Sequence, residues 1–160
     1  MSATLTLYAR DIMTTDVHTV EASTSVEAAA RTMFEQSISG VPVVDDEGTL
    51  IGVVSEFDVL ARGGDTVGEI MTQSVITVGE DTDPETIARM LIEQQIRRLP
   101  VVTDGKVVGI ISRSDLIRLF ALTRWSCEAC GYYTRGFERL SVCPKCGSET
   151  IVLEREPPGM

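Results

Sequence analysis

Hydrophobic positions along the chain follow two periods, one typical of strands and one typical of helices. Short β-branched runs at residues 17–20, 41–44 and 50–54 have the length and composition of strands. Between the first two runs, apolar residues recur at helical spacing, which predicts a helix with one buried face. Thr24 would cap this helix, and Glu27 would complete a capping box. A second helix is predicted to begin at Ser55. The predicted buried stripe of the first helix consists of Val26, Ala29, Ala30, Met33 and Phe34.

The same order of elements occurs twice in the chain. Repeated units generally stack to bury surfaces that neither can bury alone. The sequence therefore predicts an α/β (α+β) chain with two β-α-β-β-α repeats, at residues 8–64 and 65–122, followed by a small all-β domain at residues 123–155. Three motif pairs carry the repeat, DIMT at 11 and EIMT at 69, VPVV at 41 and LPVV at 99, and GVVS at 52 and GIIS at 109.

The second repeat has clear boundary signals. A helix is predicted from Asp83, with Pro84 in its first turn. Strands follow at residues 99–102 and 107–111, and the Asp104-Gly105 pair between them is a strong hairpin signal. The last helix of the repeat is predicted to begin at Ser112.

The charge distribution restricts the partners of the repeats. The net charge is −10, and residues 123–160 hold five basic and five acidic residues, so the excess of acid lies in residues 1–122. An acidic surface repels nucleic-acid phosphates, which makes nucleic acid a disfavoured partner. No apolar run approaches the roughly 20 residues that span a bilayer, and residues 1–11 lack the pattern of a signal peptide. We therefore expect a cytoplasmic protein with no membrane partner.

All four cysteines lie near the C-terminus, as Cys127-x-x-Cys130 and Cys143-x-x-Cys146. This spacing predicts a tetrahedral metal site with four thiolate ligands and no open position for a substrate. Two disulfides are the alternative, which a reducing cytoplasm disfavours. A domain this short cannot bury a stable core alone, so the metal would supply its folding energy. The aromatic residues expected in its small core are Trp125, Tyr132, Tyr133 and Phe137.

Residues 112–115 combine the groups that can hold a nucleotide at the start of a helix. Free backbone N–H groups and the helix dipole favour a phosphate there. Ser112 and Ser114 add hydroxyl donors, and Arg113 adds a guanidinium. Asp115 is an acceptor suited to the two hydroxyls of a ribose. Simple helix capping by Ser112 and Asp115 is the alternative interpretation.

The ordered motifs Ile-Met-Thr, Thr-Val, Gly-Val-Pro-Val-Val and Gly-Val-Val-Ser-x-x-Asp resemble the cystathionine β-synthase (CBS) domain. Two in tandem resemble the paired arrangement called a Bateman module, over residues 8–122. The resemblance implies two pseudo-symmetric repeats with two clefts between them that bind adenosine compounds such as AMP, ADP, ATP or S-adenosylmethionine. It also implies a homodimer formed through the CBS pair.

The resemblance further implies which residues line each cleft. The backbone near Met13 would read the adenine edge, and Ile38 would pack on the ring. Arg97 and Arg98 match a phosphate-contacting basic pair in the AMP-kinase γ subunit, although an arginine pair solvated at a helix end is the alternative. The residues expected to line the first cleft, named here the Asp115 cleft, are Asp115, Ser112, Arg113, Ser114, Arg97, Arg98, Met13, Thr14, Ile38 and Ser39. Those expected to line the second and weaker cleft, the Asp58 cleft, are Asp58, Ser55, Thr72 and Ile96.

The two clefts are not expected to be equivalent. In the second cleft Glu56 stands where the first has Arg113, and Phe57 stands where the first has Ser114. A carboxylate repels a phosphate, and the phenyl group cannot donate a hydrogen bond. We therefore expect phosphorylated ligands in the Asp115 cleft. The Asp58 cleft should bind weakly or take an uncharged adenosine group.

Residues 125–150 resemble a rubredoxin-like ribbon, which leaves both zinc and iron open as its metal, with zinc favoured for a short appended ribbon. We expect a regulatory protein that senses an adenine nucleotide and signals to an unidentified protein partner through the ribbon. Electron transfer through an iron ribbon and nucleic-acid-associated regulation through a zinc ribbon are the alternatives. An enzyme is not expected, because the sequence has one histidine, His18, and no phosphate-binding glycine loop or nucleophile elbow.

Overall fold

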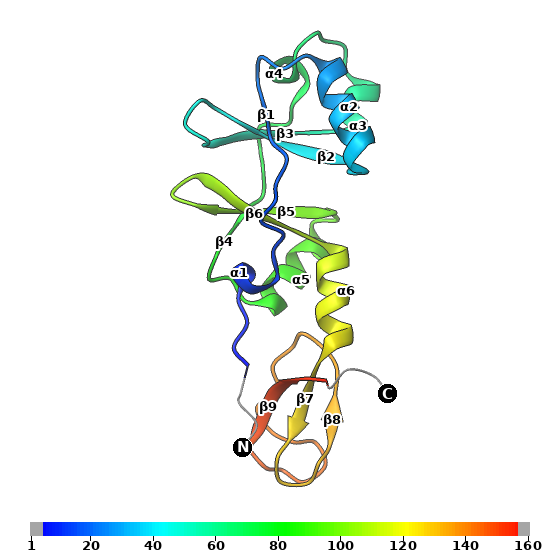
Figure 1. The fold of residues 1–160 in the computed structure, drawn as a ribbon. Helices are drawn as coiled ribbons and strands as arrows, with labels where there is room; N and C mark the ends of the chain where they lie inside the picture. The colour runs from blue at the N-terminus through cyan, green and yellow to red at the C-terminus, as the bar shows by residue number, and fades with distance from the viewer. Residues whose placement is uncertain (1–4, 157–160) are drawn as a thin grey trace. The chain divides into compact units, whose positions relative to one another are not determined.

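The computed structural model describes residues 5–156, and these divide into two compact units. One unit comprises residues 14–79 and 100–110. The other comprises residues 5–13, 80–99 and 111–156 of the described chain. Residues 1–4, which are part of the stretch considered above for a signal peptide, lie outside the described residues. Each unit is described separately below, with the labels of Figure 1.

The first unit is built on a three-stranded sheet of order β1-β2-β3. Strand β1 (Val20–Glu21) is parallel to β2 (Gly40–Val44), and β2 is antiparallel to β3 (Leu50–Ser55). Helices α2 (Val26–Gln36) and α3 (Glu56–Ala61) contact each other and the sheet (Figure 1). The short helix α4 (Val67–Ile70) contacts β1. The core between these elements consists of Ala29, Met33, Val41, Val43, Val54, Val67 and Ile70.

Helix α2 corrects two details of the sequence prediction. Its N-cap is Ser25, whose Oγ accepts from the backbone N–H of Ala28 at 3.1 Å. Thr24 does not cap the helix, because its Oγ1 accepts from the N–H of Glu21 at 3.1 Å. Phe34 is 83% exposed and therefore lies outside the buried stripe, which Ala29 and Met33 form. The strand predicted at 17–20 is also shorter and later, since β1 pairs only Val20 and Glu21 with β2.

The second repeat begins with β4 (Val78–Gly79), which pairs in parallel with β5 (Arg98–Thr103). Between them, α5 (Pro84–Glu93) is capped by Asp83 and has Pro84 in its first turn, as predicted. Strand β6 (Lys106–Ser112) follows β5 in the sheet order β4-β5-β6. Asp104 and Gly105 have φ values of 51° and 81°, which is the conformation that a tight hairpin turn requires.

Helix α6 (Arg113–Leu122) belongs to the second unit and contacts α5 and the short α1 (Ala9–Ile12). Figure 1 shows α6 passing directly into β7 (Thr123–Cys127), the central strand of the C-terminal ribbon. The ribbon is an antiparallel sheet of order β8-β7-β9, with β8 at Tyr133–Thr134 and β9 at Ile151–Arg155. The predicted mixed α/β class is thus confirmed.

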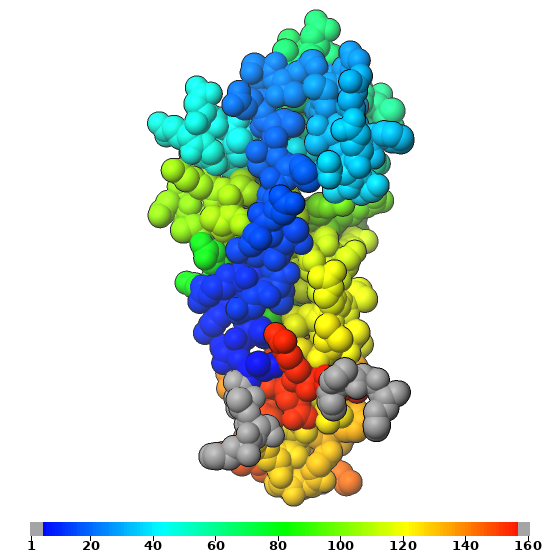
Figure 2. Space-filling view, viewed as in Figure 1, coloured from blue at the N-terminus to red at the C-terminus, as the bar shows by residue number. Residues whose placement is uncertain are grey.

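The N-terminal segment is attached to the ribbon. The backbone N–H of Leu5 donates to the carbonyl oxygen of Leu153 at 2.9 Å. Figure 2 shows the two segments, in blue and red, next to each other on the surface of this unit. One predicted core residue of the ribbon is wrong, because Tyr133 is 56% exposed and the Arg124 guanidinium lies 4.8 Å from its ring centroid. Within residues 5–156, no helix has the length and apolar character to cross a membrane.

Candidate functional site

A buried carboxylate takes part in capping the N-terminus of α6. Ser112 donates to Oδ2 of Asp115 through its backbone N–H at 2.8 Å and through Oγ at 3.1 Å. In return, the N–H of Asp115 donates to Oγ of Ser112 at 3.4 Å, which completes a capping box. Asp115 is only 8% exposed. The structure therefore contains the helix cap that the alternative interpretation describes. Both hydrogen bonds from Ser112 end on the same carboxylate oxygen.

The start of α3 has the same arrangement at Asp58. Ser55 donates to Oδ2 of Asp58 through its N–H at 2.9 Å and through Oγ at 3.0 Å. Here the other carboxylate oxygen also has partners, since Oδ1 accepts from the Thr72 hydroxyl at 3.5 Å. Oδ1 also lies 3.4 Å from Nε of Arg62. Thr72 was predicted at this site, whereas Arg62 was missed, although its spacing of one helical turn after Asp58 is a usable signal.

The two capping boxes differ at the position one turn into the helix. Arg62 in the first repeat corresponds to Leu119 in the second, at the same offset of 57 that relates Asp58 to Asp115. Leu119 cannot form an ion pair, and within residues 5–156 no ion pair joins Asp115 to an arginine of its own helix as one joins Asp58 to Arg62, although Arg118 lies three residues after Asp115. This difference adds to the predicted contrast between Glu56 and Arg113.

The flanking cationic residues of the second repeat lie in the same unit as Asp115. Arg113 and Ser114 form the exposed first turn of α6, and Arg97 is exposed just before β5. Arg98 begins β5 and is half-buried. Ile96 precedes this strand and is also half-buried.

The other predicted cleft residues come from the N-terminal repeat. Met13 caps the C-terminus of α1, and Thr14 exchanges backbone hydrogen bonds with Ile110 at 2.8 and 2.9 Å. Ile38 packs partly against the core of the first unit, and the carbonyl of Ser39 accepts from the N–H of Glu56 at 3.0 Å. Thr14, Ile38 and Ser39 belong to the first unit and Asp115 to the second, so their convergence on one cleft stays a prediction.

A pocket of ≈ 430 Å³ lies beside Asp115 within the second unit. Asp11 and Ile12 of α1 line it together with Asp115, whereas Met13 and Thr14, the two residues of this segment predicted at the cleft, do not line it. Two arginines that the sequence analysis did not select, Arg118 and Arg155, also line the pocket. Arg118 follows Asp115 by three residues, so helical spacing could have identified it. Arg155 comes from β9 and had no local signal.

The four cysteines form a cluster that fits a tetrahedral metal. Their Sγ atoms all lie within 4.8 Å of one another, with 3.7 Å between Cys127 and Cys146 and 3.6 Å between Cys130 and Cys143. Zinc–sulfur bonds of about 2.3 Å in a tetrahedron place the sulfurs about 3.8 Å apart. All four thiols are free, so the structure does not contain the disulfides considered above. The donor set and its spacing therefore fit a four-coordinate metal.

Each Cys-x-x-Cys segment has the backbone of a metal-binding knuckle. The N–H groups of Gly131 and Gly147 donate to the carbonyls of Cys127 and Cys143, each at 2.9 Å. Both glycines have φ of 79°, which other residues adopt only at a cost. Burial alone raises the pKa of Cys143, but the N–H groups of Cys146 and Lys145 favour its thiolate and lower that pKa to about 6. A hydrogen bond from the N–H of Cys130 likewise lowers the pKa of Cys127. The knuckle N–H groups thus favour the thiolates of Cys127 and Cys143, the form that binds metal. At Cys146 the N–H of Ser148 lowers the pKa, but burial and the three neighbouring thiols raise it to about 12.

The ribbon is attached to the C-terminal end of α6 by Arg135. Its Nη1 donates to the carbonyl oxygens of Phe120, Ala121 and Thr123 at 3.4, 3.3 and 3.0 Å. Its Nη2 pairs with the carboxylate of Glu156, and the N–H of Glu156 donates to the carbonyl of Leu122 at 2.8 Å. The last carbonyls of a helix have no intrahelical partner, so these contacts satisfy them with groups of the ribbon.

The sequence is similar to proteins with known structures. It is 35% identical over 138 residues to the chloroplastic CBS domain-containing protein CBSX2 of Arabidopsis thaliana, a match that covers 64% of this chain and 58% of CBSX2. The chain therefore spans less than two thirds of that relative. The crystal structure of CBSX2 in complex with AMP aligns with a TM-score of 0.68 and 40% identity, covering 71% of this chain and 96% of that one.

A second solved structure is the CBS domain pair of protein MJ0100 in complex with 5′-methylthioadenosine and S-adenosyl-L-methionine. It aligns with a TM-score of 0.66 and 34% identity, and covers 72% of this chain and 96% of that one. The CBS domain family itself matches at residues 9–64 and 67–122, and the ribbon lies outside both ranges. Since these ranges make up more than half of the sequence, the chain belongs to the CBS domain family and carries a tandem CBS pair.

Proposed function

We propose that the chain is a regulatory module that binds an adenosine-type ligand, such as AMP, ADP, ATP or S-adenosylmethionine, at the start of α6. The observation that carries this proposal is the buried capping box of Ser112 and Asp115. The binding of AMP by CBSX2 and of adenosine compounds by the MJ0100 pair supports the choice of ligand. No catalytic step is assigned to the module.

Each group at this helix start has a distinct task in the proposal. Ser112 donates two hydrogen bonds to Oδ2 of Asp115, which hold the carboxylate in one orientation. The other oxygen, Oδ1, is the atom that we assign to the ribose hydroxyls. Arg113 and Ser114, which are exposed on the first turn, would face the phosphate. Arg97 and Arg98 would add positive charge. The backbone of Met13 and Thr14 would meet the adenine, with Ile38 and Ser39 completing the cleft.

The Asp58 site is proposed as the weaker of the two. Its carboxylate already accepts from Thr72 and lies beside Arg62, so a ribose would have to displace these partners. Glu56 at the first helical position would repel a phosphate. An uncharged adenosine group, contacted by Ser55, Thr72 and Ile96, is the ligand that this site could hold.

The ribbon is proposed to report ligand binding to a protein partner. One helix, α6, begins at the capping box and ends at the carbonyls that Arg135 and Glu156 contact. A change in the position of α6 is therefore transmitted to the ribbon without an intervening flexible linker. A zinc ion held by Cys127, Cys130, Cys143 and Cys146 would stabilise the ribbon and supply no reaction chemistry. In this proposal ligand binding shifts the population of α6 positions.

We further propose that the module acts as a homodimer in the cytoplasm. Several large apolar side chains on its helices are exposed, and these are the residues that a second copy would cover in the proposed dimer. They are Phe34 on α2, Phe57 and Leu60 on α3, Ile92 on α5, and Ile117 on α6, with exposed fractions of 83, 68, 87, 75 and 67%. Sedimentation of the purified protein measures its oligomeric state, and a monomer at micromolar concentration would contradict this part of the proposal.

Calorimetric titration with AMP, ATP and S-adenosylmethionine tests the central proposal. We expect saturable heat with at least one of them, loss of that heat in Asp115→Ala, and retention in Asp58→Ala. Both variants remove one capping carboxylate, so each controls for the stability effect of the other. Heat with none of the three ligands, or loss of phosphorylated-ligand binding in Asp58→Ala alone, would overturn the proposal.

A further inference from the structure

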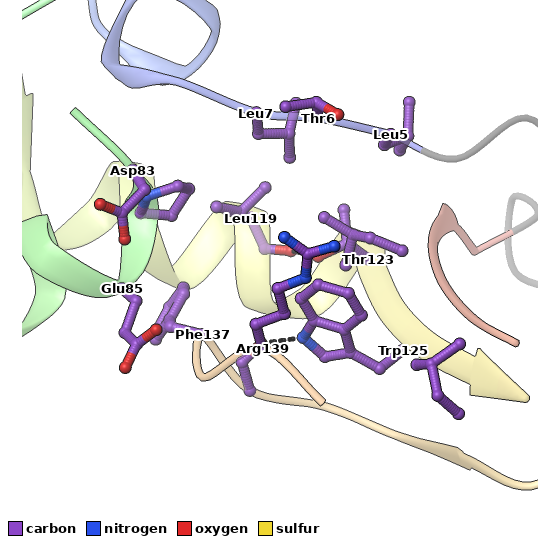
Figure 3. Close-up of a pocket in the computed structure, with 14 residues that line it drawn as sticks. Leu5, Thr6, Leu7, Asp83, Glu85, Leu119, Thr123, Trp125, Phe137 and Arg139 are labelled. Carbon is purple, nitrogen blue, oxygen red and sulfur yellow. Dashed lines mark hydrogen bonds between the residues drawn. The ribbon is translucent and has the colours of Figure 1, made fainter. Parts of the chain in front are cut away.

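A second pocket in the unit that contains the ribbon adjoins the pocket beside Asp115 and shares Leu7, Leu119 and Thr123 with it. It has a volume of ≈ 290 Å³ and lies between the ribbon, the start of α5, the end of α6 and the N-terminal segment. Figure 3 shows its lining residues. None of them belongs to either capping box. Its walls are mainly apolar, and the large apolar side chains that line it include Leu5, Leu7, Leu119, Trp125, Phe137 and Leu153.

Several polar groups of this pocket already have partners within the protein. The indole Nε1 of Trp125 donates to the carbonyl of Gly136 at 3.2 Å, and the hydroxyl of Thr123 donates to the carbonyl of Leu119 at 2.7 Å. Both acidic residues are also engaged. Glu85 pairs with Arg89 at 3.1 Å, and Asp83 accepts from the N–H and hydroxyl of Thr86 at 3.1 and 2.7 Å.

Arg139 differs from these groups. Within residues 5–156 its guanidinium makes no hydrogen bond or ion pair. Figure 3 shows the side chain extending between Phe137 and Trp125 toward Leu119 and Thr123. The pocket therefore presents an apolar body together with one uncommitted planar cation, which is the donor that best matches a carboxylate.

We propose that this pocket binds a small carboxylic acid with an apolar, preferably aromatic, body. The ring would lie against the apolar wall that includes Leu7, Leu119 and Trp125, and the carboxylate would pair with the guanidinium of Arg139. Ligand pockets usually measure roughly 300–1,000 Å³, and this one is at the lower end, so the ligand is the size of one ring with a short chain. The proposal does not rest on the proposed nucleotide function.

The single tryptophan of the chain provides a local probe, because Trp125 lines this pocket. Titration with 3-phenylpropionate should change the tryptophan emission and shift the one indole N–H resonance saturably. The neutral 3-phenylpropanamide has the same shape and should bind at least about fivefold more weakly, because it cannot form the charge-assisted pair.

Two variants test the role of Arg139. Arg139→Gln should abolish the preference for the acid over the amide. Arg31→Gln removes the same charge from an exposed position on α2, and this variant should retain the preference for the acid. Equal binding of acid and amide, an unchanged preference in Arg139→Gln, or no response of Trp125 at millimolar acid would overturn the proposal.

Discussion

Nε of Arg62 lies 3.4 Å from Oδ1 of Asp58, one helical turn after it in α3. The corresponding residue after Asp115 is Leu119. Within the described residues, the two nearly identical capping boxes thus differ in whether an arginine of the same helix forms an ion pair with the carboxylate. This difference concerns the oxygen that we assign to the ribose, so it bears directly on which repeat holds the ligand.

Exchanging these two residues should change the affinities of the sites in opposite directions. Arg62→Leu removes one of the two partners of Oδ1 of Asp58, whereas Leu119→Arg gives Asp115 an intrahelical partner that competes with a ribose. Ion pairs with this spacing contribute about 0.3–0.5 kcal/mol, so each change in affinity for adenosine should be about twofold. Calorimetric titration with adenosine measures it. Stronger binding in Leu119→Arg than in the unmodified protein would contradict this interpretation.

The first helical residue should control the response to phosphate. Glu56→Arg replaces a repelling carboxylate with the guanidinium found at Arg113, so the Asp58 site should gain about tenfold in affinity for AMP, or about 1.4 kcal/mol. Affinity for adenosine should change little, because it carries no phosphate. The reverse substitution, Arg113→Glu, is the matched control and should weaken AMP binding at the other site. Equal effects on AMP and adenosine would argue against a phosphate contact.

Loss of one cysteine ligand should unfold the ribbon. In zinc-finger peptides, metal binding supplies on the order of 10 kcal/mol of folding free energy. Cys143→Ser should therefore lose bound metal and the environment of Trp125, as measured by metal analysis and tryptophan emission. Glu149→Gln, an exposed ribbon residue that is not a ligand, should change neither. Protein from its native host should be colourless with zinc, and a red protein would show that the metal is ferric iron.

The pair of Arg135 and Glu156 should make attachment of the ribbon depend on pH. The hydrogen bond from Arg135 lowers the pKa of Glu156 below its ordinary 4.5. A lowered pKa in the folded state means that the pair stabilises the protein above the ordinary pKa. That contribution is lost as pH falls through the lowered value. The stability difference between the unmodified protein and Glu156→Gln should therefore be constant above about pH 5 and disappear in more acidic solution.

Chemical unfolding at several pH values measures this difference. Protonation of the cysteine ligands affects both proteins equally and cancels in the comparison. A difference that increases toward low pH would have the wrong sign for a carboxylate stabilised by Arg135.

Gly52 should not tolerate a side chain, because β3 passes close to the segment after α4. A Cβ atom at Gly52 would lie 2.8 Å from Sδ of Met71 and 2.9 Å from the carbonyl oxygen of Thr72. Gly52→Ala should destabilise the protein by about 1–3 kcal/mol, as overpacking does in buried positions. Gly63→Ala meets no atom within 4 Å and should be neutral or slightly stabilising. Urea unfolding of both variants tests the contrast, and equal stabilities would contradict it.

Local chemistry made several parts of this protein predictable. The Asp83 cap with Pro84, the Asp104-Gly105 turn and the two capping boxes each depend on residues within four positions of one another. The cysteine spacing was informative for the same reason, because the hydrogen bond that closes each Cys-x-x-Cys knuckle joins residues four positions apart. The error at Thr24 was also local, since adjacent Thr24 and Ser25 can both accept an N–H and their backbone conformations decided which one caps α2.

The sequence by itself thus determined the twofold repeat, the helix starts that carry Asp58 and Asp115, and the four-thiol ribbon. Only the tertiary structure decided that Arg155 lines the pocket beside Asp115, that Arg135 contacts the end of α6, and that Arg139 extends between Phe137 and Trp125. These neighbours come from different elements, so their contact depends on how the chain packs to bury its apolar surface. Short-range hydrogen bonds can be inferred from residue order, whereas side chains brought together by packing have no signature in the sequence.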